Sequence, residues 1–127
     1  MFVARRLSMS SLQYAIQKAS EIPYRRGFQR HYCIILDKRG RKLAESANSY
    51  SKTSPKMLRA ARKVGNDQAI YWHAECKAIY SLRNPEKAYK LIVVRIDAKN
   101  QPVNSAPCII CSTLMKSIGI KVVEHTV

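Results

Sequence analysis

The sequence predicts an α/β fold in which a mixed sheet of about four strands carries helices on its faces, in α/β/α layers. Strand-like runs alternate with segments of helical periodicity, and their order is helix, strand, strand, helix, strand, helix, strand. A helix between the last two strands favours a parallel pairing there. The length of 127 residues supports one hydrophobic core, so residues 1–127 are expected to form a single domain.

The first elements are expected to be a helix followed by a strand pair. Serine residues precede apolar positions that recur at helical spacing over 11–21, and Pro23 ends this helix. The apolar run 32–36 predicts a strand. The residues 38–41 (KRGR) predict a hairpin turn into a second strand over 42–46.

The rest of the chain is expected to alternate helices with strands. Three segments have apolar residues at helical spacing, and two runs of β-branched residues have strand length. Loops rich in polar residues separate them at 47–55 and 97–106. The expected elements are a short basic helix over 57–64, a helix over 73–82, a strand over 91–96, a helix over 108–118 and a strand over 120–123.

The charge of the chain is large and unevenly distributed. The formal net charge is +15, and residues 1–63 hold 15 lysines and arginines against 3 acidic residues. Residues 64–127 hold 8 against 5. A positive field of this size favours phosphate, either in a nucleic acid or on a nucleotide.

Cysteine use and hydropathy favour a cytoplasmic protein without a membrane span. Four cysteines do not suggest a disulfide framework, and no apolar signal segment follows the basic pair Arg5 and Arg6. The apolar runs, such as 91–94, have strand length, far below that of a membrane span.

A group of metal-ligating side chains lies at the predicted starts of two helices. His73 offers an imidazole, and Cys108 and Cys111 offer two thiolates in a Pro-Cys-x-x-Cys segment. Three nitrogen and sulfur ligands leave the fourth corner of a tetrahedral zinc site for water, which is typical of a catalytic site. Glu75, two residues after the imidazole, is placed to transfer protons beside that water.

The pattern His-x-Glu followed by Pro-Cys-x-x-Cys resembles that of the cytidine/deoxycytidylate deaminase-like superfamily of zinc enzymes. The resemblance extends roughly from Tyr32 to Val123. It implies a layered fold in which two helices present the ligands over one sheet, and hydrolytic deamination of a nucleobase with Zn²⁺ as cofactor. Such enzymes commonly continue beyond the fourth strand, so we expect either a minimal version or a second copy that completes the site.

Alternative roles exist for these residues. A closed structural zinc site requires a fourth protein ligand, and the candidates are His31, His125, Cys33 and Cys76. We expect Cys33 and Cys76 to pack in the core instead, because both lie among apolar residues.

Three residues are assigned to substrate binding. The resemblance implies that Asn48, after the second strand, hydrogen-bonds the sugar or base, although Asn is also common in turns. Trp72, with Tyr71 before it, either stacks on a base or packs on the sheet. Ala74 lies between the imidazole and Glu75.

Basic residues interleaved with aromatic ones favour a polyanion over a merely solvated surface. We therefore prefer cytosine, or adenine, in single-stranded nucleic acid as the substrate. The alternatives are a free nucleotide such as deoxycytidylate, and a non-catalytic zinc-stapled module that binds nucleic acid. The expected nucleic-acid contacts are Arg25, Arg26, Arg30, Lys52, Lys56, Arg59, Arg62 and Lys63.

Overall fold

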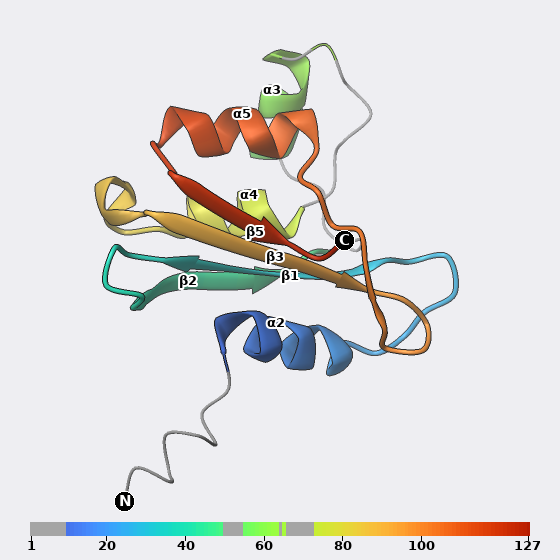
Figure 1. Cartoon of the computed structure of the whole chain (residues 1–127). Helices are drawn as coiled ribbons and strands as arrows, with labels where there is room; N and C mark the ends of the chain where they lie inside the picture. The colour runs from blue at the N-terminus through green and yellow to red at the C-terminus, as the bar shows by residue number, and fades with distance from the viewer. Residues whose placement is uncertain (1–9, 50–54, 64, 66–72) are drawn as a thin grey trace, which may run out of the picture.

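The computed structural model describes residues 10–49, 55–63, 65 and 73–127. A mixed sheet lies between helices on both faces (Figure 1). Helix α2 (Ser11–Ser20) covers one face, and α4 (Ala74–Tyr80) and α5 (Ile109–Ser117) cover the other. This arrangement confirms the α/β/α layers expected from the sequence, and it is consistent with a deaminase-like fold.

The sheet has β3 at its centre. Strand β1 pairs antiparallel with both β2 and β3, whereas β5 pairs parallel with β3. Strand β4 pairs with the last residues of β3, along the same edge as β5. The β3–α5–β5 segment is therefore the expected parallel unit. The strands are β1 (Arg30–Leu36), β2 (Lys42–Ala47), β3 (Lys90–Ile96), β4 (Pro102–Val103) and β5 (Val122–His125).

Both faces of β1 and β3 are buried, which explains their nearly continuous apolar sequences. The register places Cys33 opposite Val93 and Ile34 opposite Ile92. Side chains alternate between the faces of a strand. Cys33 and Val93 therefore pack beneath α4 and α5, and Ile34 and Ile92 pack on α2.

Local sequence explains where α2 begins. Ser10 is its N-cap, and its hydroxyl accepts from the Gln13 amide while the Gln13 side chain accepts from the Ser10 amide. This reciprocal pair satisfies two amides that a helix start leaves without partners.

Strand β5 begins two residues after the expected start at residue 120, and two short elements were not expected at all. The sheet has a fifth strand, because β4 forms inside the segment expected to be a loop. A 3₁₀ turn, η1 (Pro85–Lys87), follows the end of α4. Strand β4 has two residues, so its pairing with Arg95 and Ile96 depends on the preceding turn rather than on its own side chains.

The basic helix α3 (Pro55–Lys63) lies outermost, near α5 (Figure 1). It begins two residues before the expected range 57–64. In the described part of the chain, no helix combines the length and apolar character needed to cross a membrane.

Candidate metal centre

Two predicted ligands occupy the N-cap positions of the helices above the sheet. His73 caps α4 and Cys108 caps α5, both with extended backbone. Their carbonyl groups accept from Lys77 and Ser112, one turn later. Neither side chain caps its own helix, so the imidazole and the thiol remain available to each other.

The three predicted ligand atoms converge. The Nδ1 atom of His73 lies 3.5 Å from the sulfur of Cys108 and 3.4 Å from that of Cys111. A tetrahedral zinc ion with bonds of about 2.0–2.1 Å to nitrogen and about 2.3 Å to sulfur separates these atoms by about 3.5 Å. All three atoms lie within 4.8 Å of one another, so the group could hold a metal ion. Its spacing and its donors are compatible with zinc.

Electrostatics at the two sulfur atoms favour a bound cation. A hydrogen bond from the Cys111 thiol lowers the pKa of Cys108 to about 4, and the His73 imidazole acts in the same direction. The same hydrogen bond, a second one with Cys76 and burial raise the pKa of Cys111. A hydrogen bond with Cys108 raises the pKa of His73. Hydrogen bonds from Cys111 and His73 thus stabilise the Cys108 thiolate. A divalent cation can take the place of the protons in those hydrogen bonds.

Glu75 lies in the first turn of α4 and is only 5% exposed. Burial raises the pKa of its carboxyl group, while its own backbone amide and the charge of His73 oppose that rise. A carboxyl group whose pKa is moved toward neutrality can both accept and donate a proton. Among the described residues, the cation that lowers the pKa of Glu75 is the imidazole of His73, which belongs to the candidate metal centre.

The four alternative ligands behave differently from one another. Cys33 and Cys76 are fully buried, which confirms their expected place in the core. Cys76 nevertheless lies with its sulfur 3.1 Å from that of Cys111. Among the described residues, the atoms that converge on one point belong to His73, Cys108 and Cys111 and do not include a fourth ligand.

His31 lies near the metal centre without belonging to the ligand group. It is the cross-strand partner of Arg95. Burial lowers the pKa of His31 to about 4, and the charges of Arg95 and His73 add to this effect. His31 is therefore neutral at pH 7. The fourth alternative, His125, has its Nδ1 atom 2.9 Å from the Thr126 carbonyl oxygen.

A buried hydroxyl pair anchors the segment before Cys108. Ser105 Oγ donates to the Val93 carbonyl at 2.8 Å and lies 2.7 Å from Thr126 Oγ1. The backbone amide of Thr126 donates to Ser105 Oγ in return. These bonds join β3, the end of β5 and the approach to α5, so they fix the position of the Pro-Cys-x-x-Cys segment relative to the sheet.

The predicted substrate-binding residues have separate environments. Asn48 follows β2, where its side chain accepts from the His31 amide and donates to the Gln29 carbonyl, both at 3.0 Å. These two bonds hold the residue after β2 to the start of β1, near the metal centre. Ala74 is fully buried. Trp72, together with Tyr71, lies outside the described residues.

Most of the predicted nucleic-acid contacts are exposed, but Arg30 is not. It is 5% exposed, and its guanidinium donates to the carbonyl oxygens of Ile22 and Asp97 and to the side chain of Asn100. Its expected role in an exposed basic surface is therefore wrong, because it holds two loops together. Lys52 lies outside the described residues. The exposed ones are Arg25, Arg26, Lys56, Arg59, Arg62 and Lys63.

Two neighbours of the centre were considered from the sequence only as a possible fourth ligand. Cys76 was expected to pack in the core instead, yet it also contacts the candidate ligand Cys111. For His31, neither a core position nor an influence on the centre from the sheet was predicted. The alternation of β1 is the signal that places His31 on the same face as Cys33 and Ile35, beneath α4.

Comparison with known proteins does not identify a family. No protein-family model matches the chain, and no curated protein matches it in sequence.

Proposed function

We propose that the protein is a zinc-dependent hydrolase that deaminates a nucleobase. The observation that carries this proposal is one arrangement of side chains. A nitrogen and two sulfur atoms have the spacing of a tetrahedral zinc site, and a buried carboxyl group, Glu75, interacts electrostatically with all three residues. A structural zinc site has no need for a buried carboxyl group and is closed by a fourth protein ligand.

Different residues have different roles in the proposed reaction. Zinc bound by His73, Cys108 and Cys111 would supply a water molecule of lowered pKa as the nucleophile. Glu75 would take one proton from that water and deliver it to the ring nitrogen as the new C–O bond forms. It would then carry the second proton, from the new hydroxyl group, to the amino group, so that the C–N bond breaks and ammonia leaves. Cys76, in contact with Cys111, orients that ligand.

Single-stranded nucleic acid is the preferred substrate, with cytosine favoured over adenine. Six of the eight predicted basic contacts are exposed, and four of these lie on α3, which packs near α5. A strand threaded past the centre would meet these cations. A deaminase that acts inside a polymer needs its target base unstacked, and the free-energy cost of unstacking is lowest when the base is already single-stranded.

The test is ammonia release from cytosine and adenine, offered both in oligonucleotides and as mononucleotides. The zinc-loaded protein should deaminate cytosine in the oligonucleotide. Glu75→Gln should keep its zinc and lose about 10²-fold or more in turnover, because the proton carrier alone is removed. Glu21→Gln, which removes an exposed carboxylate, is the matched control and should leave turnover unchanged.

The other outcomes separate the alternatives. Turnover of the mononucleotide alone would identify a free-nucleotide deaminase of the deoxycytidylate type. Oligonucleotide binding without ammonia from any substrate would identify a non-catalytic zinc-stapled module. Full turnover by Glu75→Gln would contradict the assigned role of Glu75.

A further inference from the structure

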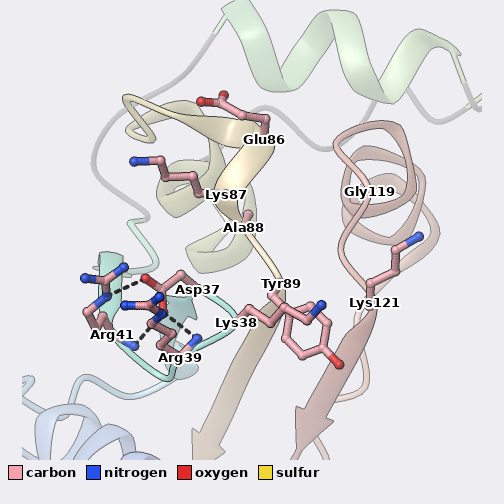
Figure 2. Close-up of a pocket in the computed structure, with 10 residues that line it drawn as sticks. All are labelled: Asp37, Lys38, Arg39, Arg41, Glu86, Lys87, Ala88, Tyr89, Gly119 and Lys121. Carbon is pink, nitrogen blue, oxygen red and sulfur yellow. Dashed lines mark hydrogen bonds and ion pairs between the residues drawn. The ribbon is translucent and has the colours of Figure 1, made fainter.

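A hollow of about 520 Å³ lies at the end of the sheet where β1 turns into β2. Three segments that are distant in sequence form its walls (Figure 2). They are the turn at 37–41, the stretch 86–89 that leads into β3, and the connection 119–121 between α5 and β5. The mechanism proposed above uses none of these residues.

Backbone hydrogen bonds join the three walls. The Tyr89 amide donates to the Leu36 carbonyl, and the Tyr89 carbonyl accepts from Lys121 and Val122. Across the turn, the Asp37 amide donates to the Arg41 carbonyl, and the Asp37 carbonyl accepts from the Gly40 amide. Gly40 has a positive φ of 79°, which suits this tight turn. The hollow is therefore a rigid feature of the fold rather than a gap between independent loops.

The lining is strongly cationic. Five basic residues face two carboxylates, and one of these carboxylates is already satisfied. Asp37 accepts from the amides of Arg39 and Arg41 and from Arg41 Nε, at 2.8–2.9 Å. These bonds hold the pKa of Asp37 below its usual value, although burial opposes them. Within the described part of the chain, Arg41 is the one basic residue of the lining that forms an ion pair, and its partner is Asp37.

The remaining cations are available to an anionic ligand. They come from all three walls: Lys38 and Arg39 from the turn, Lys87 from the second stretch and Lys121 from the third (Figure 2). All four are exposed. Four cations in one hollow exceed what a single phosphate requires, and they match two or more adjacent phosphate groups. Tyr89 adds an aromatic ring to the lining.

The hollow is remote from the candidate metal centre. The centre lies near His31, at the start of β1, as the influence of His73 on His31 shows. The hollow begins at Asp37, just after the end of β1. Six residues of strand separate the two, which corresponds to about 20 Å. A mononucleotide at the metal centre cannot reach this far, whereas a stacked strand, at about 3.4 Å per nucleotide, covers the distance with about six nucleotides.

We propose that this hollow is a binding site for adjacent phosphate groups, separate from the metal centre. Two sources share this chemistry: the backbone of a nucleic-acid strand and the polyphosphate of a free nucleotide. Binding can be measured without any turnover, so the test does not depend on the function proposed above.

The experiment compares two double variants of the full chain by titration calorimetry. Lys38→Gln/Lys121→Gln removes two cations from the hollow. Lys77→Gln/Lys99→Gln removes two exposed cations elsewhere and serves as the control, since both variants lower the net charge equally. The probes are inorganic tripolyphosphate and an abasic oligonucleotide of about ten units, which carries phosphates without bases.

The hollow variant should weaken tripolyphosphate binding on the order of tenfold relative to the control. Amide resonances of Gly40 and Gly119 should shift on addition of tripolyphosphate to the unmodified chain. If oligonucleotide binding falls in the same variant, and its salt dependence becomes shallower by about 1.4, the source is a strand. If tripolyphosphate alone is affected, the source is a nucleotide polyphosphate. Equal losses in both double variants, or no shift of either glycine, would overturn the proposal.

Discussion

The four cysteines show how side chains of one type take different roles within a few ångströms. Cys108 is half-buried and its pKa is lowered, whereas Cys33, Cys76 and Cys111 are fully buried. The spacing Cys-x-x-Cys predicts that two of them, Cys108 and Cys111, are metal ligands. The Cys76–Cys111 contact was not predictable, because it joins α4 to α5 across 35 residues of sequence and depends on how the two helices pack.

The contact between Cys76 and Cys111 leads to a prediction for metal affinity. Cys76→Ala should weaken zinc binding about 10–100-fold, because the thiol orients and polarises a ligand sulfur. Cys33→Ala removes an equally buried thiol and should leave zinc affinity nearly unchanged, because among the described residues the additional thiol in contact with a candidate ligand sulfur is that of Cys76. Competition with a chromophoric chelator measures both values. Equal effects of the two substitutions would show that Cys76 acts through core packing alone.

At the level of elements, β1, β3 and the helices were predictable because their side chains alternate or recur regularly. The exceptions, β4 and η1, are two and three residues long, and their formation depends on partners that are distant in sequence. The hollow shows the same limitation. Its turn residues Lys38 and Arg39 lie in a predictable hairpin, but Lys87 and Lys121 join them only through the order of strands in the sheet.

Contacts between α2 and the sheet converge on Glu45. Its carboxylate accepts from the hydroxyls of Tyr14 in α2 and Tyr32 in β1, and it pairs with Lys42 within β2. Burial raises the pKa of Glu45, but these three partners lower it more, so the net shift is downward. The folded state therefore favours the charged form.

This shift predicts a pH-dependent stability. Glu45→Gln should lower the free energy of unfolding by roughly 1–2 kcal/mol at pH 7, because the charged acceptor of three partners is lost. The carboxylate contributes above its unfolded pKa of about 4.5, and its contribution disappears as the pH falls through the lower folded value. Urea unfolding of both proteins between pH 7 and pH 3 checks this. A difference that stays constant, or grows, toward pH 3 would contradict the assignment.

The Ser105–Thr126 pair is the corresponding feature on the side of the metal centre. Ser105→Ala leaves the buried amide of Thr126 without its acceptor, whereas Thr126 Oγ1 keeps the Val103 carbonyl and the Arg95 amide as partners. The loss of this acceptor should cost roughly 1–3 kcal/mol of unfolding free energy. Because these bonds hold the segment before Cys108, zinc affinity should fall as well. The Ser112→Ala variant, on α5 itself, is the control. Unchanged melting of Ser105→Ala would contradict the anchoring role.

On the scale of the whole molecule, the positive charge is distributed over separate places. The exposed cations of α3 lie near α5. The hollow lies just after the last residue of β1, away from the metal centre, and Arg30, the first residue of β1, is buried. The sequence predicted the excess of charge in residues 1–63. It could not show which cations are exposed together, because burial of Arg30 depends on carbonyl groups from two other loops.

The α3 cations provide a test of polymer binding. Replacing Arg59, Arg62 and Lys63 with Gln should make the logarithmic salt dependence of oligonucleotide binding shallower by about 2, at about 0.7 per lost phosphate contact. Replacing Lys77, Arg83 and Lys99 instead removes the same charge from other exposed positions. Fluorescence anisotropy at several salt concentrations measures both slopes. Equal slopes would indicate a diffuse field rather than a path along α3.

The proposed function requires that a metal held by His73, Cys108 and Cys111 supports deamination. The most direct measurement follows zinc content and ammonia release together, on cytosine-containing oligonucleotides and mononucleotides, before chelation, after chelation and after zinc is restored. We expect one zinc per chain, ammonia that disappears with the metal and returns with it, and neither in Cys108→Ser. Full ammonia release by the metal-free chain, or none from any substrate by the zinc-loaded chain, would contradict the claim.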